Sequence, residues 1–137
     1  MALNTWIYEQ VGPSTLDYEK ATFVLYDTET GTNVTNLLPV PRGGVCVDAE
    51  IVPKDATTAA FTLDILVTRA GTAFATRSSI FGATKLVVPS GTAAGAVIAQ
   101  TVFATDPFAL AIDDVLSADI LAGDGSGVFT AVLKWRV

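Results

Sequence analysis

The alternation of apolar and polar residues with a period of two constrains the fold of this chain more than any other feature. It is clearest at the carboxy terminus of the 137 residues. The side chains that fall on one face there are Phe129, Ala131, Leu133, Trp135 and Val137. Successive side chains of a β-strand point to opposite faces of the sheet, so this pattern predicts a strand with one buried face.

Further segments carry strand patterns. Residues 61–68 and 3–10 alternate in the same way, and so do residues 45–52, with Cys46 on the polar register. In the 45–52 segment the residues expected to share the inward face are Val45, Val47, Ala49 and Ile51. Residues 21–26 are apolar in both registers, which predicts a central strand covered on both sides.

Gly and Pro clusters divide the chain into short pieces. Turn signals recur roughly every 8–15 residues and leave about 8–10 short β-rich segments between them. Short strands at regular spacing argue for a sandwich or a barrel. We expect an all-β fold, in which residues 1–137 form a single antiparallel β-sandwich domain.

One segment allows two readings. In residues 106–118, Asp106 could cap a helix that has Pro107 at its first position. Alternatively, a loop leads into a strand that turns Leu116, Ala118 and Ile120 inward. We predict a strand over 115–121 and at most one short helical turn near 107–112.

Charge and composition exclude several classes of protein. Fourteen acids against eight bases give a net charge of −6, which repels a phosphate backbone, so we expect no nucleic-acid partner. Apolar runs are shorter than the ~18–20 residues of a membrane span, and the start lacks the basic region of a secretory signal, so we expect neither membrane association nor export. A single cysteine fits synthesis in a reducing cytosol.

Candidate chemistry is sparse. The chain has no histidine, which removes histidine metal sites and histidine-based catalytic triads. Four acids, Asp113, Asp114, Asp119 and Asp124, lie close in sequence but match no calcium-loop spacing, and we read them as turn and edge residues. Residues 123–127 are Gly-rich and predict a hairpin loop. We therefore expect no enzyme, no catalytic residue, no metal and no cofactor, although Asp, Lys and Tyr can support catalysis elsewhere.

The residue balance points to contacts with other chains. Half of the residues are hydrophobic, more than one small sandwich needs inside, so we expect a homo-oligomer. Large aromatic and arginine side chains are typical of protein interfaces. The interface candidates chosen on this basis are Trp6, Tyr8, Arg42, Arg69, Arg77 and Trp135. The aromatic members, together with Tyr26, also fit a core or a sugar-stacking platform.

The chain resembles small structural proteins of tailed bacteriophages. The resembling parts are the polar start MALNTW, the Ala-, Thr- and Gly-rich strands, and the closing stretch FATDPFALAIDDVLSADILAGDGSGVFTAVLKWRV. The resemblance implies a jelly-roll-like capsid decoration (cement) protein, made in the host cytoplasm and carried on the capsid exterior. The implied partners are the major capsid protein and further copies of the chain, with a homotrimer favoured.

Other functions compete with this one. A carbohydrate- or receptor-binding module can share the sandwich fold, and it would present an exposed aromatic row or a calcium site. Another virion role, such as a tail, fibre or minor capsid component, has the same sequence signals. We expect a non-enzymatic structural protein that stabilises a capsid by bridging coat subunits.

Overall fold

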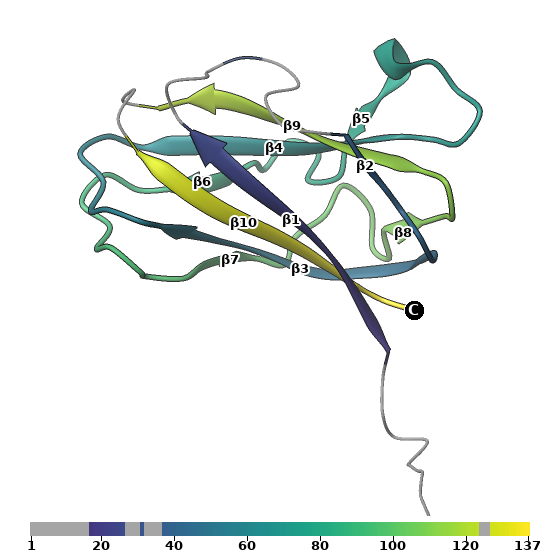
Figure 1. The fold of residues 1–137 in the computed structure, drawn as a ribbon, viewed down its shortest axis with the longest axis horizontal. Helices are drawn as coiled ribbons and strands as arrows, with labels where there is room; N and C mark the ends of the chain where they lie inside the picture. Colours follow the sequence, from purple (N-terminus) through teal and green to yellow (C-terminus); the bar gives the residue numbers. More distant parts are fainter. Residues whose placement is uncertain (1–16, 27–30, 32–36, 124–126) are drawn as a thin grey trace, which may run out of the picture.

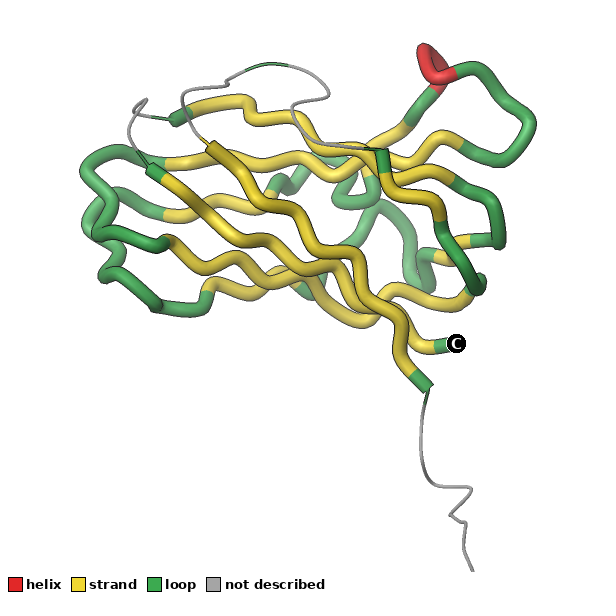
Figure 2. The backbone as a smooth tube through the Cα atoms, viewed as in Figure 1, coloured by secondary structure: helices red, strands yellow, loops and turns green. Residues whose placement is uncertain are grey.

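The computed structural model describes residues 17–26, 31, 37–123 and 127–137. Two antiparallel sheets lie face to face around one hydrophobic core (Figure 1). Helical structure in these residues is limited to one 3-10 turn, η2 (Phe74–Thr76), at the tip of a long loop (Figure 2). No helix in the described ranges is long and apolar enough to cross a membrane.

Five strands make up each sheet. The first sheet contains β1 (Tyr18–Tyr26), β10 (Val128–Arg136), β3 (Gly44–Pro53), β7 (Ile98–Gln100) and β8 (Ala109–Leu110). The second sheet contains β2 (Leu38–Pro39), β9 (Val115–Ala122), β4 (Phe61–Thr68), β5 (Ser78–Ser79) and β6 (Leu86–Val88).

The strand order is that of a jelly roll. The first sheet runs β1-β10-β3-β7, with β8 also on β3, and the second runs β2-β9-β4-β5, with β6 also on β4. The chain crosses between the sheets so that its first strand pairs with its last, β1 with β10, and β2 pairs with β9. A jelly roll has eight strand positions, wound as two Greek keys. The ten strands here fill these eight positions because β5 and β6 both lie beside β4, and β7 and β8 both lie beside β3. The expected antiparallel β-sandwich is confirmed.

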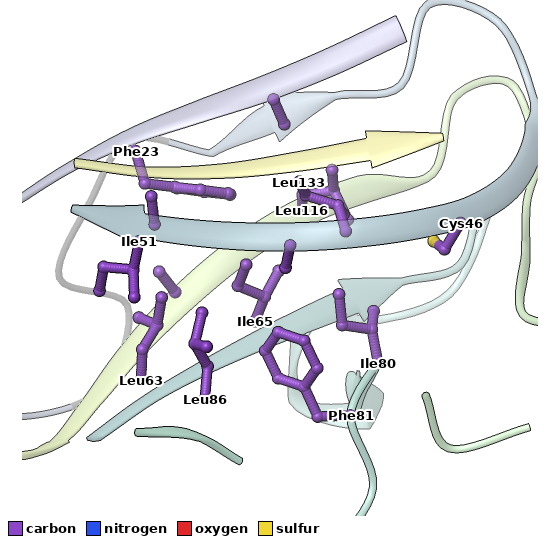
Figure 3. Packing of buried hydrophobic residues seen from close by; sticks show 14 of the residues in the cluster. Phe23, Cys46, Ile51, Leu63, Ile65, Ile80, Phe81, Leu86, Leu116 and Leu133 are labelled. Carbon is purple, nitrogen blue, oxygen red and sulfur yellow. The ribbon is translucent and has the colours of Figure 1, made fainter. Parts of the chain in front are cut away.

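The alternation of the two clearest segments is confirmed. In β4 the residues Phe61, Leu63, Ile65 and Val67 are buried, and in β10 so are Phe129, Ala131, Leu133 and Trp135. Their side chains meet between the sheets, where Leu63, Ile65 and Leu133 lie among other aliphatic groups (Figure 3). The Phe61 and Phe129 rings stack with centroids 3.9 Å apart and join one sheet to the other. Val137 differs from the pattern because it lies beyond β10 and is exposed.

The prediction of a central strand over 21–26 is wrong. β1 ends the order of the first sheet, and only one of its faces is buried, through Ala21, Phe23 and Leu25. Val24 and Tyr26 point outward and are about half exposed. Any strand of a two-layer sandwich has one face on the core and one in solvent, so the outer apolar residues remain accessible. The predicted strand over 3–10 lies outside the described residues.

The inward face of the 45–52 strand is also corrected. Cys46 is buried, whereas Val47 is exposed. A β-bulge causes this change of phase, because Lys134 pairs with Asp48 and the next residue, Trp135, pairs with Cys46. The extra residue in β3 reverses the alternation on the amino-terminal side of the bulge.

The segment near 107–112 forms a short strand in place of the helical turn. Ala109–Leu110 is β8, which pairs with Gly44 and Val45 of β3. The amide of Cys46 donates a hydrogen bond to the carbonyl of Phe108, whose side chain is buried. Pairing with a strand distant in sequence outweighs the local helix signal. The alternative prediction, a strand over 115–121, is confirmed as β9.

Candidate interaction surfaces

A buried carboxylate joins two loops at one end of the sandwich. Asp114, between β8 and β9, is 1% exposed, and its Oδ2 lies 2.8 Å from Nη1 of Arg69, after β4. The amides of Ala70 and Ala111 donate hydrogen bonds of 2.9 Å to the same carboxylate. Arg69 also donates to the carbonyl of Ala109. These contacts hold both loops in fixed positions at the end of the sheets.

Electrostatics keeps Asp114 charged. Burial alone would raise the pKa of this carboxyl, but the amides of Ala111 and Ala70 and the guanidinium of Arg69 favour the charged form more strongly. The pKa of Asp114 is therefore lowered from its usual value. The Arg69 guanidinium also lies 5.3 Å from the centroid of the Phe108 ring.

A second group of charges lies on the outer face of the second sheet. Asp119 of β9 accepts two hydrogen bonds from Arg77, at 2.8 and 3.0 Å. Asp64 of β4 lies 3.1 Å from Nζ of Lys85 and accepts a hydrogen bond from Ser79. All four charged side chains are mostly buried. Because both cations come from the chain between β4 and β6, the pairs hold this long excursion against the sheet.

Arg42 contacts surface acids through its side chain and a core residue through its backbone. Its side chain is half exposed and forms ion pairs with Glu19 at 2.9 Å and Asp17 at 3.6 Å. Its hydrogen bond to Glu19 raises the pKa of the Arg42 guanidinium. The carbonyl of Arg42 accepts a 2.8 Å hydrogen bond from Nε1 of Trp135. The loop before β3 is thus tied to both β1 and the core.

The interface candidates predicted from the sequence differ in how much of their side chain is exposed. Arg42 and Arg69 keep exposed surface, whereas Arg77 is mostly buried in its pair with Asp119. Trp135 is 1% exposed and is a core residue, because β10 turns it inward and Arg42 takes its only polar atom. It offers no side-chain surface to a partner in this conformation. Trp6 and Tyr8 lie outside the described residues.

The acids considered as calcium ligands do not gather. Asp114 and Asp119 pair with different arginines, and Asp113, at a φ of 68°, occupies the turn between β8 and β9. Asp124 is not among the described residues. Within the described part of the chain, no group of three or more acids and cysteines is placed to hold a metal ion.

The outer face of the first sheet carries a charged depression that the sequence analysis did not single out. Its lining residues are Lys20, Thr22, Asp48, Glu50, Val132 and Lys134. The strand registers place these residues in two rows, Lys20–Lys134–Asp48 and Thr22–Val132–Glu50. The rows cross β1, β10 and β3, which are neighbours in the sheet (Figure 1). The signal was present in the sequence as charges on the polar register of two predicted strands, but only strand pairing brings them together.

Comparisons with known proteins complete these observations. No protein-family model matches the chain, and neither does any curated protein. Among solved structures, one described as the capsid of Ralstonia phage GP4 is similar over 93% of this chain and 88% of its own, with 18% identity and a TM-score of 0.47. Another, described as the cyanophage Pam1 capsid asymmetric unit, covers 97% and 94%, with 15% identity and a TM-score of 0.35.

Proposed function

We propose that this chain is a non-enzymatic structural component of a phage virion, which decorates the capsid exterior and stabilises it by bridging neighbouring coat subunits. The observation that carries the proposal is the jelly-roll order of the sheets in a chain whose sequence resembles phage virion proteins. Jelly rolls also serve as lectin domains and cupins. Since one fold supports many functions, the surface of this chain must supply the rest of the argument.

A bridging protein needs two separate contact surfaces, and the described residues offer two. One is the loop end built around Asp114 and Arg69, where Ile112 is 60% exposed. The other is the outer face of the first sheet, where Val24 and Tyr26 are exposed and which joins the chain to a further copy. Val24 and Tyr26 are neighbours on one face of β1, and contiguous exposed apolar patches commonly mark protein contacts.

The buried ion pairs suit a mechanical role. They hold the excursion between β4 and β6 and the loop before β9 against the sandwich, so the loops keep one shape when a load is applied. Apolar burial contributes about 25 cal/mol per Å² at each seam. Repeated over many copies, modest seams add up to a shell that resists internal pressure.

Cosedimentation tests the proposal. The purified chain is mixed with capsids of its own phage that lack it, over a range of concentrations. We expect saturable binding at a fixed ratio to the coat protein and a higher disruption temperature of the loaded capsids. A chain that ignores capsids would contradict decoration, and glycan binding by that chain would support a carbohydrate-binding module instead.

A matched pair of variants locates the contact. Ile112 at the loop end and Leu121 near the end of β9 are both well exposed, at 60% and 48%, and Leu121 belongs to neither proposed contact surface. We expect Ile112→Asp to weaken capsid binding about 10-fold or more, and Leu121→Asp to leave it unchanged. Equal binding by both variants would exclude the loop end as the capsid contact. Light scattering on the same samples gives the number of copies: the sequence resemblance favours three, whereas a single two-fold contact gives two.

A further inference from the structure

The charges on the outer face of the first sheet are sorted by strand. Basic groups lie toward β1, since Lys20 belongs to β1 and the Lys134 ammonium lies 5.5 Å from the centroid of the Tyr18 ring. Acidic groups lie on β3, as Asp48 and Glu50. Val132 of β10 lies between the two sides. The face is therefore basic on its β1 side and acidic along β3.

Asp48 lacks a partner in this face. Its Oδ1 atom is buried and has no hydrogen-bond partner among the described residues. Buried polar atoms in proteins are nearly always paired, and an unpaired carboxylate oxygen is costly. Lys134, directly opposite in the strand register, leans toward Tyr18 instead. Among the described residues Asp48 forms no ion pair, so a cation of a second chain over the depression would compensate its charge.

We propose that the outer face of the first sheet packs against the same face of a second copy, about a two-fold axis parallel to β10. Rotation by 180° about this axis exchanges the β1 and β3 sides and preserves the position along the strands. Lys20 of each copy then faces Asp48 of the other, so a cation lies against each of these carboxylates. Two-fold contacts require such a self-complementary patch.

The remaining rows of the face agree with this arrangement. Val132 lies near the axis and faces its own equivalent, and Thr22 faces Glu50 of the second copy. In the next row the registers align Val24, Thr130 and Val52 within one chain. Across the two-fold axis, the half-exposed Val24 of one copy then faces Val52 of the other. Two sheets packed in this way keep their strands nearly aligned, as in the sandwich itself. The charge pattern and the apolar pattern thus select the same axis.

The area of this face sets the strength that we expect for the association of two copies. Three strands of about nine residues, at ~3.4 Å per residue and ~4.8 Å between strands, cover roughly 400 Å² per copy. Stable complexes bury about 800 Å² per partner. We therefore expect weak association in solution, seen at high protein concentration, and stronger pairing where copies are held close together on a shell.

A charge exchange tests the contact. Lys20→Glu places two acids against each other across the axis, and Asp48→Lys places two bases against each other. We expect each variant alone to associate about 10-fold more weakly than the natural chain. Mixed in equal amounts, they should associate again, because every contact then joins a base and an acid. Sedimentation equilibrium measures the association, and Asp55→Lys, an exposed loop change, is the control.

Cross-linking keeps the proposal testable if a variant fails to fold. A carbodiimide joins a lysine to a carboxylate in direct contact, so the natural chain should give a cross-linked dimer with a Lys20–Asp48 peptide linkage. Circular dichroism confirms the fold of each variant. Association that is unaffected by either variant, or cross-linked oligomers without this linkage, would overturn the proposal. These experiments contain no capsid. A failure of self-association would therefore leave the result of the capsid cosedimentation experiment unaffected.

Discussion

Asp64 of β4 and Asp119 of β9 stand directly opposite each other in the second sheet, and each carboxylate has its own cation. Like charges in opposite positions destabilise a strand pair. Arg77 pairs with Asp119 and Lys85 pairs with Asp64, so both acids are compensated within the chain. The strand pair therefore depends on a segment that is not part of either strand.

Removal of one cation should expose this dependence. Arg77→Met leaves Asp119 mostly buried, unpaired from its cation and beside Asp64. We expect a loss of ~3–5 kcal/mol in the free energy of unfolding, as for other broken buried pairs. Urea denaturation followed by fluorescence measures the loss. The double variant Arg77→Met, Asp119→Leu should recover most of it, and a double variant as unstable as the single one would contradict the explanation.

Asp114 should make stability depend on pH at the acid end. Its pKa is lowered in the folded chain, so its contribution is complete above the unfolded value near 3.8 and is lost as the pH falls through the folded value. We expect the melting temperature of the natural chain to fall more steeply below about pH 4 than that of Asp114→Asn. Thermal melts from pH 2 to pH 6 provide the comparison, with Asp113→Asn as the matched exposed control. Parallel curves for the natural chain and Asp114→Asn would refute this role.

Cys46 should be unreactive in the folded protein. Burial raises the pKa of its thiol to about 12, so little thiolate exists at pH 8 and reagents cannot reach it. We expect negligible labelling by a thiol reagent in buffer and one label per chain in denaturant. Rapid labelling without denaturant would show that the end of the sandwich near β8 opens readily.

Trp135 should matter through packing more than through its hydrogen bond. Trp135→Phe removes the Nε1 donor to Arg42 but keeps most of the ring in the core, and we expect a loss of about 1 kcal/mol in unfolding free energy. Trp135→Ala also leaves a cavity, for which we expect ~3–5 kcal/mol. Chemical denaturation separates the two. Equal losses would mean that the hydrogen bond dominates.

The sequence by itself determined which residues face the core wherever strands are regular. In 61–68 and 128–136 the period of two already identified the buried side chains, because side-chain direction in a strand is a local property. The same reasoning found β9, where Leu116, Ala118 and Ile120 are buried as expected.

Only the tertiary structure decided which strands lie at an edge and which charges meet. The apolar outer residues of β1 remain exposed because, in the described residues, no further layer covers the outer face of the first sheet, and the bulge in β3 exists only against β10. Asp114 and Arg69 are 45 residues apart in the chain. Local periodicity carries no information about pairing across such separations, because strand order and register depend on the packing of the whole sandwich.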